Sequence, residues 1–258
     1  IIKIPSSLGG LSKKSGVEKA PEIIQKNIKN FYLKESGILP IFEFEEIKPI
    51  KSNIEKTNKK IYKNISKISD PAIILGGDHS ITYPCFKGFK KNYKNPGIII
   101  FDAHPDCENN FSPPTHEDYL RVLVEEGHVK KENIILIGIR NTHSNELEFL
   151  KKNKIKTYPM EEFSHNGSIE YTNTIMSVAR KFDALYLSLD IDVIDPAFAP
   201  GTGYIEPGGF TSREMLFFLH RLKNLKNLKM MDLVEVNPEK DIRNLTVNLA
   251  AKIVVEMS

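Results

Sequence analysis

The sequence has few of the features that mark secreted, membrane or nucleic-acid-binding proteins. Two cysteines, Cys85 and Cys107, are too few for a disulfide framework in 258 residues, and their scarcity favours a reducing cytoplasm over secretion. No apolar run approaches the roughly 20 residues that a membrane-spanning helix requires, so we expect neither a signal peptide nor a membrane partner. The 36 basic and 33 acidic residues give a net charge of only +3, which gives little reason to propose nucleic acid as a partner.

Short apolar, β-rich runs alternate with longer segments of helical spacing, which is typical of parallel strands joined by crossover helices. The expected strands are Ala72 to Leu75, Gly97 to Phe101, Asn133 to Gly138, Lys154 to Tyr158, Leu185 to Leu189 and Lys229 to Val236. The expected helices are Pro21 to Tyr32, Ile54 to Ile68, Glu117 to Glu126, Glu146 to Lys152, Ser168 to Lys181 and Ser212 to Leu222, with one more near the C-terminus. The strands are apolar throughout, which indicates burial on both faces. With no internal repeat and no break, residues 1–258 are interpreted as a single α/β domain with a mostly parallel sheet.

Six side chains that can bind metal follow three of these strands. They are His79 in GGDHS, then Asp102, His104 and Asp106 in FDAHPD, then Asp190 and Asp192 in SLDIDVID. Ligands in open parallel sheets lie beyond the carboxyl ends of the strands, and alternating residues in extended chain point to the same side. Carboxylate and imidazole groups in this mixture suit a pair of divalent cations, most plausibly manganese, which can activate water. The sequence therefore predicts a two-metal hydrolase.

Neighbouring residues have simpler interpretations. Asp195 precedes Pro196, and we expect it to shape the following turn. Asp78 either orients a metal ligand or caps the next helix. The Gly76–Gly77 pair predicts a tight turn and a close backbone approach, because it is too short for a phosphate-binding loop.

Several motifs, in this order, resemble the signatures of the ureohydrolase family, the binuclear manganese enzymes that include arginase and agmatinase. The three central ones are GGDHS at 76–80, DAHPD at 102–106 and SLDIDVIDPAFAPGTG at 188–203. GVEKAPEII at 16–24 is similar to the family's N-terminal segment, and DLVEVNP at 232–238 is similar to its last active-site strand. The resemblance implies a three-layer α/β/α fold, two Mn²⁺ per subunit with Ni²⁺ or another divalent metal as alternatives, and a homo-oligomer, commonly a trimer or hexamer.

The resemblance assigns the same six metal ligands and adds two residues. Glu235 matches the carboxylate that holds the substrate guanidinium, a planar cation that donates two hydrogen bonds. His116 matches a histidine proposed to shuttle protons or assist the leaving amine, although Glu117 replaces the glycine that usually follows it. Asp106 is expected to accept the proton of the attacking water, so the predicted catalytic set is Asp106, His116 and Glu235.

The loop CENNFSPPTH departs from the arginase pattern, and substrate choice depends on it. Glu108 stands where arginases have a neutral Asn, and its charge disfavours a substrate carboxylate. Tyr204 replaces a small hydroxyl residue, and Ser164 lies near the place of an acidic residue. Agmatine, with a terminal ammonium for Glu108, is therefore slightly favoured, although Asn110 can still bind a carboxylate.

Other functions remain open. Arginine, formimidoylglutamate, guanidinobutyrate and guanidine are alternative small-molecule substrates, and guanidine raises the question of nickel. A single-zinc deacetylase is disfavoured because the ligand set suits two metals. A catalytically silent relative that binds metabolites is disfavoured because all six ligands are intact.

Overall fold

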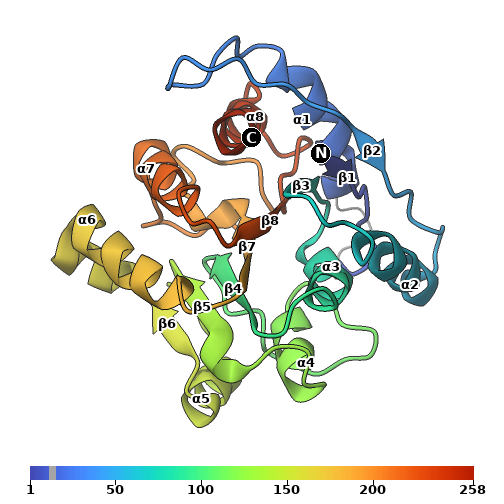
Figure 1. Ribbon diagram of the computed structural model, residues 1–258, viewed down its shortest axis with the longest axis vertical. Helices are drawn as coiled ribbons and strands as arrows, with labels where there is room; N and C mark the ends of the chain where they lie inside the picture. The colour runs from blue at the N-terminus through green and yellow to red at the C-terminus, as the bar shows by residue number, and fades with distance from the viewer. Residues whose placement is uncertain (12–15) are drawn as a thin grey trace.

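The computed structural model describes residues 1–11 and 16–258, and its described strands form one parallel sheet (Figure 1). The strands are β1 (Ile2–Lys3), β2 (Glu45–Glu46), β3 (Ala72–Leu75), β4 (Pro96–Phe101), β5 (Ile134–Ile137), β6 (Lys156–Tyr158), β7 (Ala184–Asp190) and β8 (Leu228–Val234). Their order is β2-β1-β3-β8-β7-β4-β5-β6, and every pairing is parallel. All residues of β4, β5 and β7 are buried, as their continuous apolar sequences predicted.

Helices cover both faces of the sheet and complete three layers (Figure 1). The helices are α1 (Ala20–Ile28), α2 (Ile54–Ile65), α3 (Thr82–Lys90), α4 (Tyr119–Glu125), α5 (Ser144–Asn153), α6 (Met160–Ala179), α7 (Ser212–Leu222) and α8 (Leu245–Met257). One apolar core joins the sheet to α1, α6, α7 and α8, and the other joins it to α2, α3, α4 and α5. The three-layer α/β/α fold that the resemblance implied is therefore confirmed.

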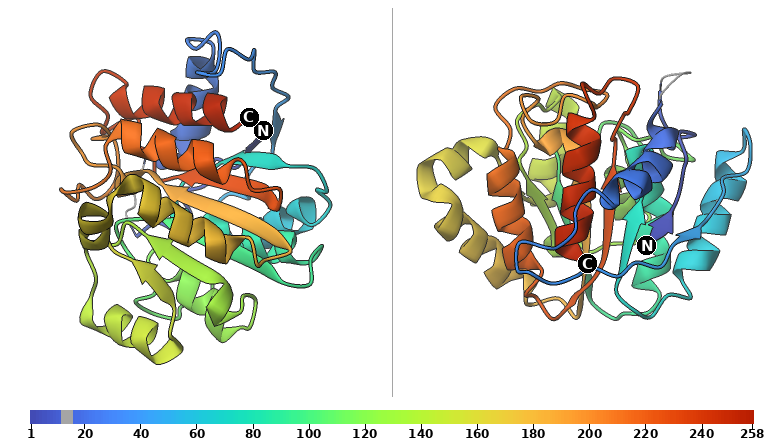
Figure 2. Two further views of the ribbon diagram at one scale, coloured as in Figure 1. Left: turned by 60° about the vertical axis from the view of Figure 1, so that its left-hand side comes forward. Right: turned by 90° about the horizontal axis from the view of Figure 1, so that it is seen from above.

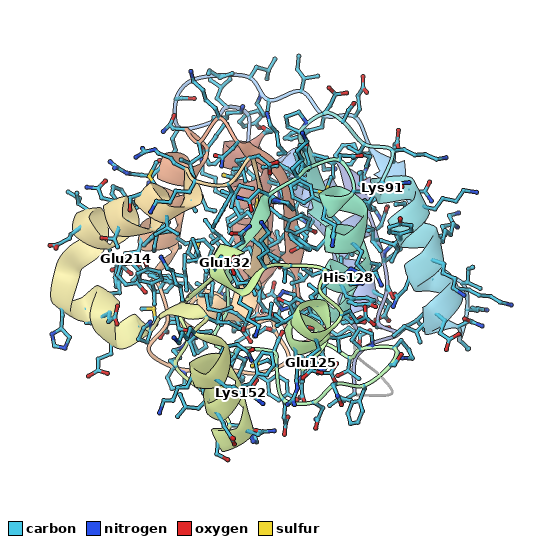
Figure 3. All side chains as sticks on the ribbon, turned by 60° about the horizontal axis from the view of Figure 1, so that its bottom comes forward. Lys91, Glu125, His128, Glu132, Lys152 and Glu214 are labelled. Carbon is cyan, nitrogen blue, oxygen red and sulfur yellow. The ribbon has the colours of Figure 1, made fainter. Side chains whose placement is uncertain are left out.

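The helices form because each presents an apolar stripe to the sheet and polar groups to water. In the lysine-rich α2, Ile61 and Ile65 are fully buried although most of the helix is charged or polar. Charged side chains such as Lys91, Glu125 and Lys152 are exposed on the outside of the molecule (Figure 3). A capping box is present at the start of α7, where the side chains of Thr211 and Glu214 each accept a hydrogen bond from the other's backbone N–H.

Three elements were absent from the sequence prediction. β1 and β2 are two residues each, too short to show a periodic pattern. α3 contains Pro84 and Gly88, both poor helix formers, but seven of its nine residues are buried. α6 begins before the predicted Ser168, with a break at Gly167, whose φ of 71° is not helical.

The arrangement separates the termini from the carboxyl edge of the sheet. The right-hand view of Figure 2 shows the termini near one another, where β1 begins and α8 ends. Gly77 lies at the other end, in the turn after β3, and a Cβ there would be 1.8 Å from the carbonyl oxygen of Ser6. This close backbone approach is what the glycine pair predicted. Within the described residues, no helix is long and apolar enough to cross a membrane.

Candidate metal centre

The six predicted metal ligands converge at the carboxyl edge of the sheet. β3, β8, β7 and β4 are consecutive neighbours there. His79 begins a 3₁₀ turn, η2 (His79–Ile81), shortly after β3, while Asp102 directly follows β4 and Asp190 ends β7. Because parallel strands end side by side, residues far apart in sequence meet at this edge.

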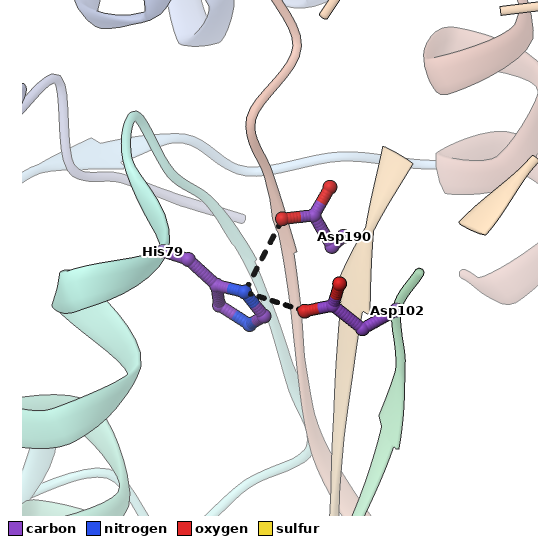
Figure 4. Close-up of side chains that lie close together, drawn as sticks. All are labelled: His79, Asp102 and Asp190. Carbon is purple, nitrogen blue, oxygen red and sulfur yellow. Dashed lines mark ion pairs between the residues drawn. The ribbon is translucent and has the colours of Figure 1, made fainter. Parts of the chain in front are cut away.

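One group of ligands surrounds Nδ1 of His79. This atom lies 3.1 Å from Asp102 Oδ2, 2.9 Å from Asp106 Oδ2 and 3.2 Å from Asp190 Oδ2, and Figure 4 shows the first and last of these pairs. Among the described residues, neither His79 Nδ1 nor Asp102 Oδ2 has a hydrogen-bond partner, although both are buried. Buried polar atoms without partners are costly, so this donor set fits a bound cation.

A second group shares Asp102 with the first. His104 Nδ1 lies 3.1 Å from Asp192 Oδ2 and 3.5 Å from Asp102 Oδ1. The two oxygens of Asp102 therefore face different imidazoles, which allows this carboxylate to bridge two cations. In each of the sets His79–Asp102–Asp190 and Asp102–His104–Asp192, the ligand atoms lie within 4.8 Å of one another.

The far side of His79 is held by a buried network that the sequence analysis did not identify. His79 Nε2 lies 2.9 Å from Ser188 Oγ and 3.0 Å from Tyr119 Oη. Ser188 Oγ donates to Asp232 Oδ1 at 2.7 Å, so its lone pairs are left to accept a hydrogen bond from the N–H at His79 Nε2. The hydrogen-bond directions thus assign the proton to Nε2 and leave Nδ1 free to bind metal.

Three of the four aspartates have raised pKa values, whereas interactions with His104 and His79 outweigh burial and lower the pKa of Asp102. Burial and the charge of Asp102 raise the pKa of Asp106 well above its usual range, and burial, Asp192 and Asp102 do the same for Asp190. Among the described residues, none of the four aspartates forms an ion pair with a lysine or arginine. Two divalent cations would offset this repulsion, so the charge of the site also fits the two-metal prediction.

Two residues of the site have backbone conformations that are unusual without glycine. Asp106 has a φ of 51° and Glu235 a φ of 60°. The backbone is held in place at both, since Asp106 O accepts from the Leu120 N–H at 3.1 Å and the Glu235 N–H donates to Gly77 O at 2.8 Å. Such conformations cost about 1–3 kcal/mol and are concentrated at functional sites.

A pocket of about 170 Å³ opens beside the ligands. Its lining includes Glu108, His116 and Glu235 from the sequence prediction. Asn110 is not among the lining residues, and its amide donates to Glu125 Oε2 at 3.3 Å. All predicted site residues except Asn110 and Asp102 therefore line one pocket, and Asp102 lies against the lining residues His79 and His104.

Glu235 and His116 contact each other within this pocket. His116 Nδ1 lies 3.1 Å from Glu235 Oε1, which also accepts the His79 backbone N–H at 2.8 Å. Burial alone would lower the pKa of His116, but the hydrogen bond and charge of Glu235 outweigh burial and raise it to about 9. The imidazole is therefore suited to carrying a proton near the substrate position.

Five lining residues had no role in the sequence prediction: Asn141, His143, Glu146, Thr202 and Gly203. The hydroxyl of Thr202 is buried and has no hydrogen-bond partner among the described residues. Asn141 and His143 line the pocket from the loop after β5. Ser164 does not line the pocket. The expectation that Ser164 lies near the substrate was wrong, because Ser164 is in α6 and its hydroxyl donates to Met160 O. The only signal for Thr202 was its place in the GTG segment.

Two further acidic residues shape the turns around the site. Asp78 accepts the backbone N–H groups of Ser80 and Gly9, both at 3.0 Å, and thus caps η2 instead of orienting a ligand side chain. Asp195 accepts backbone N–H groups from both sides of the loop that follows it, including that of Gly208 at 2.7 Å. It is a turn residue, as predicted.

Comparisons with known proteins agree with this geometry. The model of the arginase family matches residues 1–258. The chain is 36% identical over 243 residues to an arginase of Staphylococcus aureus, covering 88% of this chain and 78% of the relative. It is 31% identical over 271 residues to a formimidoylglutamase of Halalkalibacterium halodurans, covering 99% and 84%.

The chain belongs to the arginase family. A solved structure, the formimidoylglutamase of Bacillus subtilis, superimposes with a TM-score of 0.93 at 28% identity, covering 99% of this chain and 84% of that one. The resemblance inferred from the motifs is therefore confirmed, as is its arginase-like fold. The protein is a hydrolase that acts on guanidino or amidino carbon–nitrogen bonds.

Proposed function

We propose that this protein hydrolyses a guanidino compound whose other end is cationic, with agmatine as the favoured substrate, to give urea and an amine. The observation that carries the proposal is the charge of the pocket. Besides metal ligands, its lining contains the carboxylates of Glu108, Glu117, Glu146 and Glu235. No lysine or arginine occurs among the described lining residues.

The four carboxylates have different tasks. The oxygens of Glu146 accept the backbone N–H groups of Cys107 and His143, both at 3.0 Å, so this residue is occupied within the protein. Glu235 belongs to the guanidinium end. Glu108 Oε1 has a distant partner in His143 Nδ1, at 3.8 Å, and is available for an ammonium group. A substrate carboxylate there would meet like charge.

The residues of the chain divide the reaction among them. Glu235 holds the planar guanidinium by hydrogen bonds, and the unpaired hydroxyl of Thr202 offers a further contact. Asp106 accepts a proton from the attacking water. His116 delivers a proton to the departing amine, for which its raised pKa keeps it charged near neutral pH. Two divalent cations held by the six ligands would supply Lewis-acid activation of water.

We further propose manganese as the metal, a cytoplasmic location and a homo-oligomeric assembly of a single-domain subunit. The mixture of aspartate and imidazole ligands supports manganese, with nickel as the alternative. The two free, buried thiols, Cys85 and Cys107, support a reducing compartment.

Formimidoylglutamate is the second candidate, because the Bacillus subtilis formimidoylglutamase has a TM-score of 0.93. Its substrate carries carboxylates, which the acidic pocket lining disfavours. Arginine is disfavoured for the same reason, although a relative is named arginase.

The test is a substrate panel after manganese loading, repeated with nickel. Release of urea, ammonia and formamide is followed from agmatine, arginine, guanidinobutyrate, formimidoylglutamate and guanidine. We expect the highest kcat/KM with agmatine. A clear preference for arginine or formimidoylglutamate would show that the proposed cationic end is wrong.

The variant Glu108→Gln sharpens this test. Loss of one ion pair in a partly exposed pocket is worth about 1 kcal/mol, so we expect KM for agmatine to rise about fivefold. Guanidine has no second cationic group to contact Glu108, so its KM should be unchanged. Glu132→Gln is the matched control, because Glu132 lies at the amino end of β5, away from the pocket.

A further inference from the structure

Two residues at which this chain departs from the family pattern contact each other. Glu117 stands where a glycine usually follows the histidine, and Tyr204 stands where a small hydroxyl residue is usual. The Tyr204 hydroxyl donates to Glu117 Oε1 at 2.8 Å, although the residues are 87 positions apart. Both line the substrate pocket. The two residues that differ from the family pattern, Glu117 and Tyr204, are therefore hydrogen-bond partners.

The Tyr204 ring lies beside two functional imidazoles. Its centroid is 6.3 Å from that of His116 with an interplanar angle of 29°, and 5.5 Å from that of His104 with an angle of 66°. Tyr204 is 47% exposed, so burial alone does not fix its position. The hydrogen bond to Glu117 restrains a ring that would otherwise sample other rotamers.

Each partner is attached to a different part of the site. Next to Tyr204, the Gly203 carbonyl accepts from Lys240 Nζ at 3.1 Å. The Glu117 carbonyl accepts the Glu108 N–H at 3.1 Å. This hydrogen bond joins the two ends of the loop at 107–116, on which substrate choice depends. The pair therefore links the loop that carries His116 to the segment after β7.

The His116 imidazole has few restraints of its own. Its Nδ1 contacts Glu235 at 3.1 Å, and its Nε2 lies 3.4 Å from the Leu11 N–H, which the charged imidazole cannot accept. The Glu235 carboxylate must also receive the substrate, which competes for the first contact. When substrate occupies Glu235, the contact between the His116 ring and the Tyr204 ring is then the main interaction that still holds the imidazole in position.

We propose that Tyr204 and Glu117 are positioning residues that hold the His116 imidazole over the substrate position. This inference rests on the proposed function, in which His116 delivers a proton to the leaving amine. The hydrogen bond to Glu117, then partial burial, raises the pKa of Tyr204 to about 12, so the phenol remains a donor at physiological pH.

The test is a double-mutant cycle with Tyr204→Phe and Glu117→Ala. Each single variant should lower kcat about tenfold, equivalent to about 1.4 kcal/mol, with KM within twofold of wild type. The double variant should be no worse than either single one, because both remove the same link. Glu117→Gln should retain most activity, since its amide oxygen still accepts the phenol proton.

Tyr83→Phe is the matched control. The Tyr83 hydroxyl donates to Glu126 Oε2 at 2.6 Å, a similar bond outside the pocket lining. Its kcat should remain within twofold of wild type. A general loss of stability on removing a tyrosine–glutamate bond would appear in this variant too.

Crystal structures of the manganese-loaded variants provide a readout that does not depend on turnover. We expect His116 in one orientation beside Glu235 in the wild type and in several orientations in Tyr204→Phe and Glu117→Ala. Unchanged kcat with His116 in place would overturn the inference, as would a rise in KM alone. If the wild type hydrolyses no panel compound, the proposed function fails, while the orientation of His116 still decides whether the pair positions it.

Discussion

Two groups of buried or partly buried acidic side chains among the described residues differ in whether the protein's own cations neutralise them. Around the C-terminal helix, Glu256 is 3% exposed and accepts from Lys252, from His220 Nε2 and from the Glu35 backbone N–H. Burial opposes its ionisation, but these partners outweigh burial and lower its pKa to about 2. At the metal centre, Asp106 and Asp190 have no lysine or arginine partner among the described residues, and their pKa values are raised.

The difference distinguishes acidic side chains that stabilise the fold from acidic side chains that are available to bind metal ions. Near α8, Arg213 Nη1 also donates to Glu35 Oε2 at 2.8 Å. Cationic side chains of the protein itself therefore pair with the acidic side chains of this group. At the carboxyl edge, four aspartates face two imidazoles, and His79 Nδ1 and Asp102 Oδ2 have no hydrogen-bond partner in the part of the chain that the structure describes. Neutralising a carboxylate should therefore have opposite consequences in the two places.

Asp106→Asn should have the largest effect on turnover. The amide cannot accept the proton of the attacking water, so we expect kcat to fall by about 10³-fold or more. The fold should persist, because asparagine tolerates a φ of 51° and the lost repulsion from Asp102 offsets the weaker contact with His79. Urea release assays and thermal unfolding of metal-free protein measure the two effects.

In metal-free protein, the melting temperature of this variant should equal or exceed that of wild type. A marked fall would mean that Asp106 stabilises the fold, and the contrast between the groups would be lost. Residual turnover above about 10% of wild type would instead disprove its role as proton acceptor.

Asp232→Asn should have an intermediate effect, through His79. The Asp232 carboxylate accepts from Thr82, Tyr186 and Ser188, and the amide cannot accept from all three. With Ser188 reoriented, the tautomer of His79 is less well fixed, and manganese affinity should fall about 10–100-fold. Competition against a chelator measures this, and kcat at saturating metal should change far less.

Tyr186→Phe is the control, because Tyr186 donates to Asp232 without contacting His79 in any hydrogen bond described. It should leave manganese affinity within about twofold of wild type. If both variants lose stability but neither loses metal affinity, Asp232 belongs with the charges that stabilise the fold.

The sequence was sufficient for the parts of the site that lie next to strands. Asp102 follows an unbroken apolar run, and the order of GGDHS, DAHPD and SLDIDVID indicated a common edge before any coordinates. The same reasoning correctly gave the parallel sheet, because it depends on local apolar patterns that a single sequence displays. The three layers were implied by the resemblance to the ureohydrolase family instead.

Contacts between distant segments could not be predicted in this way. Asp232 lies inside β8, where nothing local shows that its side chain meets residues of α3 and β7. Asn110 was expected in the pocket because it shares a loop with Glu108, but the loop turns it toward Glu125. Tyr204 and Glu117 were recognised as departures, yet only the fold shows that they bind each other.

Glu256→Gln should have the smallest effect on turnover and the opposite effect on stability. Loss of a charged acceptor from this network should lower the free energy of unfolding by about 1–2 kcal/mol, with kcat within twofold of wild type. Because the folded pKa of about 2 lies below the reference value of 4.5, the carboxylate stabilises the protein fully above pH 4.5 and loses this contribution as the pH falls toward 2. Urea unfolding should therefore show a difference between wild type and variant that is large at pH 7 and smaller at pH 3. A variant that is as stable as wild type at pH 7 but impaired in turnover would show that this group, too, is reserved for function.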